Sequence, residues 1–327
     1  MEQADKKPRV DSGKVAIIGS GLIGRCWATL FLRGGYSVML YDVISEQLGG
    51  AMSAVVEKLR VMEKEGLLRE GQTAEELAKR VTSSSSLKDA VEGAVYVQEC
   101  TPENVSLKQK VFGELDSLAD DDVILASSTS CIMPSVFTSD LQHKAQCIVA
   151  HPINPPHYIP LVEVVPSPWT SQTVVSSTMD IMRSLGQSPI RAKKEVNGFI
   201  LNRLQYALIM EAWRLVEDGI ASPEDVDQAV VEGLGMRYSF MGVFETMHIN
   251  ADGMEDYCKR YGANITEVCK SQTPPRALGG DTLATINDAM IKKIPLEKLK
   301  EKREWREQRL AALVSHTAEM KSQENTN

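Results

Sequence analysis

Glycines at positions 19, 21 and 24 form the pattern G-x-G-x-x-G, which alone is a weak signal. Here the pattern follows an apolar run and opens a helical pattern, and Asp42 stands eighteen residues after Gly24. In this context Gly19 allows a tight turn, Gly21 a close approach of the backbone to a pyrophosphate, and Gly24 close packing of helix on strand. The pattern therefore predicts a dinucleotide site at a helix N-terminus.

The acidic residue distinguishes between the two nicotinamide dinucleotides. Asp42 would accept hydrogen bonds from the ribose hydroxyls, and its carboxylate would repel a 2′-phosphate. No arginine follows it, because residues 43–45 are Val-Ile-Ser. We therefore expect NAD rather than NADP. Leu22 and Ile23, in the first turn of the helix, would offer free N–H groups to its phosphates.

Three further segments place polar residues at the end of an apolar run or inside one. Packing alone would favour apolar residues at these positions. Residues 127–131 read Ser-Ser-Thr-Ser-Cys at the end of one run, and His151 follows another. A third run, 161–165, is interrupted by one carboxylate, Glu163. A buried acid is costly unless it is paired, and His151 is the obvious partner.

A histidine held by a carboxylate can remove a proton near neutral pH. Oxidation of an alcohol by hydride transfer requires loss of the hydroxyl proton, and Glu163 would fix the tautomer of His151 and stabilise its imidazolium. Ser130 would hydrogen-bond the oxygen as it becomes a carbonyl. Two alternatives are a structural role for His151 and a serine run that caps a helix before Pro134. The other four histidines lack such a setting, and we interpret them as surface or hydrogen-bonded structural residues.

The elements that would position these residues alternate between short apolar runs and longer helical patterns. We expect strands over 15–18, 37–41, 81–83, 94–98, 123–126 and 147–150, and helices over 22–33, 46–64 and 106–118. Such alternation predicts a parallel sheet covered on both faces. The carboxyl ends of its strands would bring the glycine turn, Ser130 and His151 to one edge.

The pattern changes after residue 160. A strand over 161–165 and a helix over 173–185 precede an almost wholly helical remainder, which opens with a mostly apolar helix over 199–218 that we expect to be buried. The fold class is thus α/β, a doubly wound parallel sheet of the Rossmann type followed by a smaller all-α domain. We predict a flexible tail over 1–13, domains over 14–194 and 195–314, and a flexible tail over 315–327.

Composition narrows the range of partners. The 327 residues carry 36 Lys and Arg against 44 Asp and Glu, a net charge of −8. An acidic chain repels phosphate backbones and anionic lipids, so nucleic acid and membranes are poor partners. Six scattered cysteines form no C-x-x-C pair and no cluster has metal-ligand spacing, so we expect reduced thiols and no metal. No signal peptide or long apolar run is visible, which predicts a cytosolic protein.

The spacing of the polar residues resembles the 3-hydroxyacyl-CoA dehydrogenase superfamily, which joins a Rossmann domain to a helical domain. Its pattern has a serine after the fifth strand, a histidine in H-x-x-N-P, a glutamate twelve residues later, and an asparagine in G-F-x-x-N-R. Ser130, His151, Glu163 and Asn202 match it. The resemblance implies that His151 is the catalytic base, supported by Glu163, and that Ser130 and Asn202 bind and position the substrate.

The resemblance implies two further cofactor contacts and a substrate class. Members use a glutamate and a lysine early in the helix after the fourth strand, and Glu103 and Lys108 occupy these positions. From about Lys14 to about Leu313 the chain is similar to a branch of the superfamily that acts on L-gulonate, most clearly in HPINPPHYIPLVEVVP and EGLGMRYSFMGVFETMHINADGM. This implies a cytosolic homodimer that oxidises the 3-hydroxyl of L-gulonate with NAD⁺.

The chain departs from the acyl-CoA enzymes after the histidine. Pro152 and Ile153 stand where those enzymes have aromatic residues, which favours a small anionic substrate, bound between the domains, over a long acyl-CoA. A free carboxylate needs a cation, and Arg237 is the candidate. The alternative for Arg237 is an ion pair on a helix surface or dimer interface. Alternative functions are a dehydrogenase for 3-hydroxyacyl-CoA, 3-hydroxybutyrate or carnitine, and a structural lens protein with a vestigial site.

Overall fold

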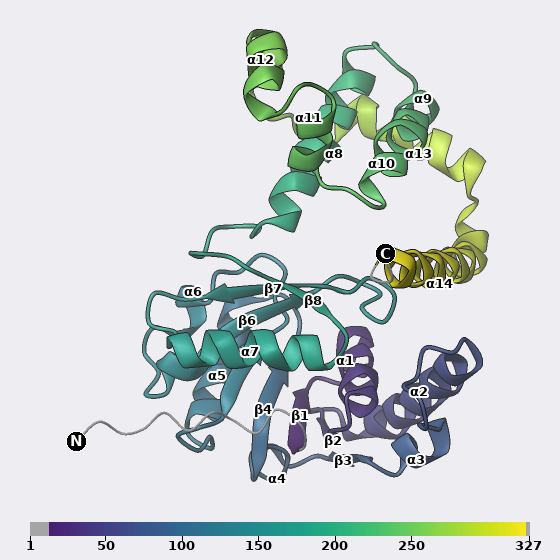
Figure 1. The fold of residues 1–327 in the computed structure, drawn as a ribbon. Coiled ribbons are helices and arrows are strands. Elements are labelled where there is room, and N and C mark those ends of the chain that lie inside the picture. Colours follow the sequence, from purple (N-terminus) through teal and green to yellow (C-terminus); the bar gives the residue numbers. More distant parts are fainter. Residues whose placement is uncertain (1–12, 325–327) are drawn as a thin grey trace. The chain divides into compact units, whose positions relative to one another are not determined.

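Eight strands form one sheet in the N-terminal part of the chain, with the order β3-β2-β1-β4-β5-β6-β7-β8 (Figure 1). The computed structural model describes residues 13–324, and the chain divides into two units between Arg203 and Leu204. The first unit holds the sheet. Its strands are β1 (Lys14–Ile18), β2 (Ser37–Tyr41), β3 (Val81–Ser84), β4 (Ala94–Glu99), β5 (Ile124–Ser127), β6 (Cys147–Pro152), β7 (Leu161–Pro166) and β8 (Ser188–Arg191).

The sheet has the doubly wound topology that the alternating pattern predicts. Every neighbouring pair of strands is parallel except β6 and β7, which are antiparallel. The strand order reverses between β1 and β4. In open sheets of this kind, the crevice beyond the carboxyl ends of the strands at the reversal is where ligands bind.

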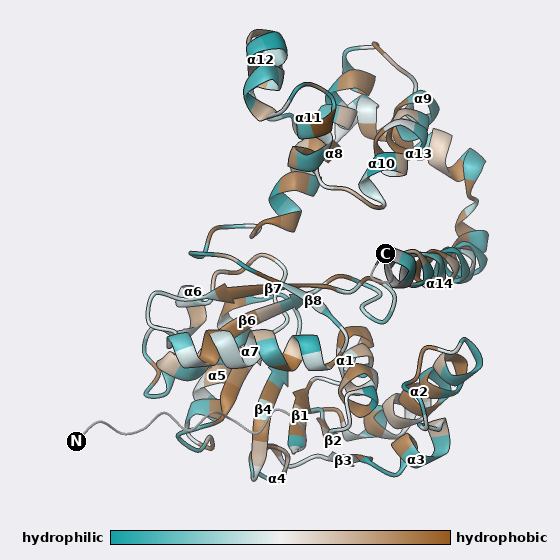
Figure 2. Cartoon of the chain, viewed as in Figure 1, coloured by the Kyte–Doolittle hydropathy of each residue, from teal (hydrophilic) through white to brown (hydrophobic). Residues whose placement is uncertain are grey.

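Helices cover both faces of the sheet because its central strands are apolar on both sides, as their colours show in Figure 2. Val15 and Ile17 of β1 pack on one face with Trp27, and Ile18 packs on the other with Phe112. The first face is covered by α1 (Leu22–Arg33), α2 (Ser45–Lys64), α3 (Ala74–Ala78) and α7 (Gln172–Ser184). The second is covered by α4 (Leu87–Val91), α5 (Val105–Asp116) and α6 (Ser135–Thr138), and η1 (Lys144–Gln146) is a short 3₁₀ turn.

Some short elements are not predicted from the sequence. Strand β8 contains Pro189, which cannot donate to a sheet ladder and is tolerated because β8 is an edge strand. Helices α3, α4 and α6 have five residues or fewer, too few to show a helical period. His151 is expected to follow a strand that ends at residue 150. It lies inside β6 instead, because this strand extends through Pro152.

The second unit is helical, as predicted. It contains most of α8 (Leu201–Glu217), then α9 (Pro223–Gln228), the π-helical η2 (Ala229–Gly235), α10 (Met236–Tyr238), α11 (Val243–Ile249), α12 (Met254–Ser271), α13 (Gly280–Lys293), η3 (Leu296–Lys298) and α14 (Leu299–Glu324). Leu204, Tyr206 and Leu208 of α8 are exposed, so the prediction of a buried helix over 199–218 is wrong for the single chain. None of the described helices is long and apolar enough to cross a membrane.

The structure describes the C-terminal tail through Glu324 but not most of the N-terminal one. The N-terminal tail 1–13 lies outside the described residues except for Gly13. The predicted flexible tail 315–327 is helical through Glu324, because α14 is rich in Lys, Glu, Arg and Leu and has no Gly or Pro to interrupt it. The predicted boundary after residue 194 falls nine residues before the division at Arg203.

The ion pair of Lys108 and Glu99 is fully buried in the first unit. Lys108 Nζ is 3.0 Å from each carboxylate oxygen of Glu99, and these side chains are 1% and 0% exposed. Glu99 also accepts hydrogen bonds from Thr101 and from the hydroxyl of Ser127. Removing one member of such a pair leaves a buried charge without compensation, which costs more than the pair itself contributes.

We expect Lys108→Met to lower the free energy of unfolding by about 3–5 kcal/mol, because Glu99 would keep its charge without a cation. The matched control is Lys110→Met on the same helix, where the side chain is 73% exposed and lies 3.9 Å from Glu114. That change should cost less than about 0.5 kcal/mol. Urea unfolding of both variants at pH 7 makes the comparison, and equal costs would contradict it.

His157 is the one predicted structural histidine that lies deep in the first unit. It is 6% exposed, its ring lies 4.3 Å from that of Tyr158, and neither ring nitrogen has a hydrogen-bond partner among the described residues. The interpretation of His157 as a hydrogen-bonded residue is therefore wrong. Burial, helped by the positive charges of Lys58 and Arg33, lowers its pKa to about 3 from an ordinary value of 6.5.

This shift makes stability depend on pH. Between pH 6.5 and 3 the unfolded chain binds the His157 proton and the folded chain does not, so stability rises with pH and is lost on acidification. We expect His157→Leu to reduce that loss by up to about 1.4 kcal/mol per pH unit. Urea unfolding from pH 7.5 to 4.5 measures the slope, with the exposed His316→Leu as control. An unchanged slope in His157→Leu would refute the assignment.

Candidate active site

A cavity of about 500 Å³ lies at the carboxyl ends of β1 and β4, where the strand order reverses. The predicted glycine turn forms one wall of it. The lining residues from that turn and from the ends of β2 and β4 include Gly19, Gly21, Leu22, Ile23, Asp42, Cys100 and Thr101. Five of the eight predicted cofactor residues therefore line the cavity. A sixth, Gly24, lies in the first turn of α1, directly after the glycine turn.

The three glycines meet different surroundings. Gly19 has φ +104°, and a Cβ there would lie 2.8 Å from the carbonyl oxygen of Cys100. A Cβ on Gly24 would lie 1.9 Å from the carbonyl oxygen of Gly19, so helix α1 can approach the turn only with glycine there. A Cβ on Gly21 would meet nothing within 4 Å, because this position faces open space. A narrow turn with one open position fits a pyrophosphate.

Asp42 is held as a charged group at the edge of the cavity. Its Oδ2 accepts hydrogen bonds from the backbone N–H and the hydroxyl of Ser20, both at 2.7 Å, and Oδ1 accepts one from Ile44 N at 3.0 Å. Burial opposes ionisation, but these hydrogen bonds outweigh it and lower the pKa of Asp42. A fixed negative charge here fits the ribose hydroxyls of NAD and disfavours a 2′-phosphate.

His151 and Glu163 face each other across the antiparallel strands β6 and β7. His151 Nδ1 lies 2.8 Å from Glu163 Oε2, and both residues are buried. The other oxygen of Glu163 accepts hydrogen bonds from the N–H groups of Ile200 and Leu201, at 2.7 and 2.8 Å. Burial alone would raise the pKa of Glu163, but these hydrogen bonds and that from His151 lower it.

The charged carboxylate decides which nitrogen of His151 is basic. An ionised Glu163 accepts but cannot donate, so the ring proton resides on Nδ1 and the lone pair on Nε2. The ring of Phe199, at 5.8 Å, packs beside His151, and Phe199 has a positive φ of 50°. Sequence reasoning missed Phe199, although it stands in the G-F-x-x-N-R segment.

Ser130 and Asn202 are brought together, but through the backbone of Ser130. Asn202 Nδ2 donates to the carbonyl oxygen of Ser130 at 2.8 Å and lies 3.5 Å from the sulfur of Cys131. The hydroxyl of Ser130 is exposed and has no partner among the described residues. Asn202 therefore holds the serine loop, while the Ser130 hydroxyl is the group left to meet a ligand.

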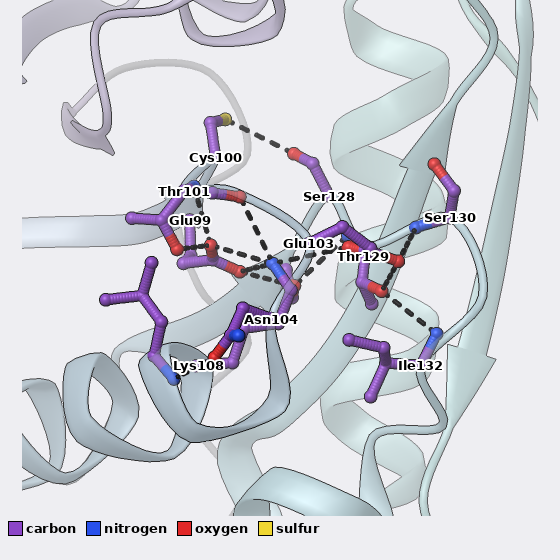
Figure 3. A network of polar contacts seen from close by, with 12 residues as sticks. Glu99, Cys100, Thr101, Glu103, Asn104, Lys108, Ser128, Thr129, Ser130 and Ile132 are labelled. Atoms are coloured by element: carbon purple, nitrogen blue, oxygen red, sulfur yellow. Dashed lines mark hydrogen bonds and ion pairs between the residues drawn. The ribbon is translucent and has the colours of Figure 1, made fainter.

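Glu103 and Lys108 lie in the network drawn in Figure 3. Glu103 Oε1 accepts hydrogen bonds from Thr129 Oγ1 at 2.6 Å and from the N–H groups of Ser130 and Cys131, both at 3.1 Å. Lys108 is buried against Glu99 and does not line the cavity. The structure thus gives Lys108 a supporting place behind the site, which spacing alone does not reveal.

Arg237 belongs to the second unit, on the short helix α10. It is exposed, its Nε donates to the carbonyl oxygen of Gly233 at 3.3 Å, and no acidic partner is described for it. The preceding turns, η2, are π-helical, a rare form that is frequently found at functional sites. Within residues 13–324 no group of three or more His, Cys, Asp or Glu side chains is arranged to hold a metal ion.

Comparison with known proteins places these features in a family. Residues 14–196 match the NAD binding domain of 3-hydroxyacyl-CoA dehydrogenase, and residues 198–283 match its C-terminal domain. Lambda-crystallin of Oryctolagus cuniculus is 49% identical over 95% of this chain and 98% of its own. L-carnitine dehydrogenase of Oceanobacillus iheyensis is 37% identical over 76% of this chain and 80% of its own.

A solved structure agrees in fold with this chain. The structure is that of 5-formyl-3-hydroxy-2-methylpyridine 4-carboxylic acid 5-dehydrogenase, an NAD⁺-dependent dismutase. It superimposes with a TM-score of 0.76 at 28% identity, over 93% of this chain and 97% of its own. The glycine turn, the charged Asp42 and the matching NAD binding domain agree on the cofactor, which is NAD. The chain belongs to the 3-hydroxyacyl-CoA dehydrogenase family, and among its relatives within that family are the lambda-crystallins.

Proposed function

We propose that this protein oxidises the 3-hydroxyl of a small, free hydroxy acid, and that this acid is L-gulonate, which yields 3-dehydro-L-gulonate. The observation that carries the proposal is the buried pair of His151 and Glu163 at 2.8 Å, at the carboxyl edge of a sheet whose crevice suits NAD. Bound NAD⁺ supplies the acceptor for the hydride. The chain itself has to bind the acid and remove one proton.

The proton leaves through His151. Nε2 of the neutral ring takes the proton of the 3-hydroxyl, and the imidazolium that forms is stabilised by Glu163, whose second oxygen stays bound to the N–H groups of Ile200 and Leu201. The hydroxyl of Ser130 hydrogen-bonds the substrate oxygen as it becomes a carbonyl. Asn202 acts here by holding the backbone of Ser130.

Support for L-gulonate comes from resemblance along nearly the whole chain to the L-gulonate branch of the family, together with Pro152 and Ile153 after the base. Carnitine is the second candidate, because L-carnitine dehydrogenases are among the relatives. Its quaternary ammonium would favour an aromatic cage. Tyr158 is buried and donates to Glu65 at 2.8 Å, whereas Tyr238 and Phe240, close to Arg237 in the sequence, are exposed.

We further propose a homodimer that uses the second unit. Its helices leave many large apolar side chains in contact with solvent in the single chain, and large exposed apolar patches mark sites of protein–protein interaction. Those on α8, α11, α12 and α14 include Leu204, Leu208, Ile209, Phe244, Ile249, Ile265, Val268, Trp305 and Leu313. Because α14 is a helix of 26 residues, it is long enough to reach across a partner.

The substrate and the base are tested together by initial rates of NADH formation with L-gulonate, L-carnitine, 3-hydroxybutyrate and a 3-hydroxyacyl-CoA. We expect L-gulonate to give the highest kcat/KM and His151→Gln to lower kcat by about 10²–10⁴-fold, because the general base is lost. The matched control is His143→Gln, since His143 also pairs with a carboxylate, Asp116, at 3.0 Å but outside the site.

The outcomes separate the parts of the proposal. Another acid preferred over L-gulonate, with an inactive His151→Gln, would change only the substrate. Full activity in His151→Gln would refute the mechanism. NAD⁺ binding without turnover of any acid would favour a structural protein with a vestigial site.

Arg237 is proposed to bind the substrate carboxylate. We expect Arg237→Met to raise KM for L-gulonate by about tenfold or more with little change in kcat, because a charge-assisted hydrogen bond is lost. Sedimentation velocity of the same variant, which we expect to show an intact dimer, is measured alongside. A dissociated dimer with an unchanged KM would assign Arg237 to the dimer interface instead.

A further inference from the structure

Hydrogen bonds hold the end of β5 and the first residue of the loop that follows it. The hydroxyl of Ser127, the last residue of β5, donates to Glu99 at 2.5 Å, and the hydroxyl of Ser128 accepts from Trp27 at 3.0 Å and Gln98 at 2.7 Å. The hydroxyl of Ser130, in contrast, is exposed. A loop that is fixed beside one free hydroxyl presents that hydroxyl in a defined direction.

The backbone N–H groups of Ser130 and Cys131 are bound by one side chain, while the Ser130 carbonyl is bound by Asn202. Glu103 Oε1 accepts the hydrogen bonds of the Ser130 and Cys131 N–H groups, both at 3.1 Å, and of Thr129 Oγ1 at 2.6 Å (Figure 3). Three donors therefore converge on a single carboxylate oxygen. Hydrogen bonds to an ionised acceptor are about twice as strong as neutral ones, so this oxygen can hold the loop.

The second oxygen of Glu103 makes a longer contact. Oε2 lies 3.7 Å from Lys108 Nζ, and the Glu103 side chain is 43% exposed. Lys108 is already bound to both oxygens of Glu99 at 3.0 Å. Its positive charge therefore attracts the Glu103 carboxylate without a close hydrogen bond. The two oxygens thus have separate tasks, with Oε1 on the loop and Oε2 available to a ligand.

We propose that Glu103 is a positioning residue for Ser130, acting through the backbone N–H groups of Ser130 and Cys131, in addition to any contact that it makes with the cofactor. The inference rests on the proposed function for the role of Ser130 in binding the reacting oxygen. If Glu103 is lost, the Ser130 hydroxyl remains, but its backbone keeps the carbonyl bond to Asn202 and loses the N–H bonds, so its direction is less well fixed. Rate should then fall even when the cofactor is bound.

A double-mutant cycle separates this role from a cofactor contact. We expect Glu103→Ala to lower kcat by about tenfold to hundredfold at saturating NAD⁺, because small displacements of a positioned group are costly. In a Ser130→Ala background the same change should cost less than roughly twofold, because the group that it positions is gone. Losses that multiply in the double variant would overturn the proposal.

Two readouts that do not depend on turnover accompany the cycle. The dissociation constant of NAD⁺, measured by calorimetry, should change less than about threefold in Glu103→Ala, since Asp42 and the glycine turn remain. Amide hydrogen exchange at Ser130 and Cys131 should speed up. Binding of NAD⁺ weakened in proportion to the loss of kcat/KM, with unchanged amide exchange, would make Glu103 a cofactor contact alone.

Conservative variants guard against a folding defect. Glu103→Gln keeps an oxygen that can accept the same three hydrogen bonds and should recover part of the rate, while Thr129→Val removes one of those bonds and should show a weaker form of the same loss. Glu92→Gln, an exposed glutamate outside the site, is the control for loss of charge. If the wild-type protein oxidises no hydroxy acid, the proposed function fails, and amide exchange still decides whether Glu103 holds the loop.

Discussion

Two carboxylates inside the sheet must have their oxygens matched by donors, and this requirement organises the site. Glu163 is matched by His151 and by the N–H groups of Ile200 and Leu201. Glu99 is matched by Lys108 and by donors that include Ser127. A buried charge left without partners would cost several kcal/mol, so each carboxylate draws segments from distant parts of the sequence to one place.

Each carboxylate joins segments at the carboxyl edge of the sheet. Glu163 joins the end of β6 to the entry of α8, so the same side chain orients His151 and binds the start of α8. Glu99 joins the end of β4 to the start of α5 and the end of β5. Glu103, five residues before Lys108, then extends this second network to the loop that carries Ser130.

Local patterns could be predicted from the sequence because their physical causes are local. Gly24 is such a case, since a Cβ there would lie 1.9 Å from the carbonyl oxygen of Gly19 in the same turn. The pairing of His151 with Glu163 was also accessible, because one acid in an apolar strand demands a partner. The same argument applied to Glu99, at the end of another apolar strand, would have predicted a buried cation.

Other features could not be predicted because they depend on which surface of an element is covered by another part of the molecule. Lys108 stands in a helical pattern beside Lys110, and nothing in the spacing says that one is buried and the other exposed. The apolar helix α8 poses the same difficulty, because its pattern indicates burial but not by which surface. The edge strand β8 could not be predicted because it contains Pro189. Proline argues against a strand unless that strand lies at the edge of a sheet.

The NAD site and the proposed carboxylate contact therefore differ in how they are specified. Asp42, the glycine turn and the two buried carboxylates all belong to the first unit, and each has its hydrogen-bond or ion-pair partners there. Such an arrangement suits an NAD site shared by a family, because each charged group is fixed within the same unit. Arg237, in contrast, stands in the second unit beside a π-helical turn and has no described acidic partner. Under the proposed function, a cation with few internal constraints can be exchanged without disturbing His151, so differences in substrate between relatives would arise more readily there.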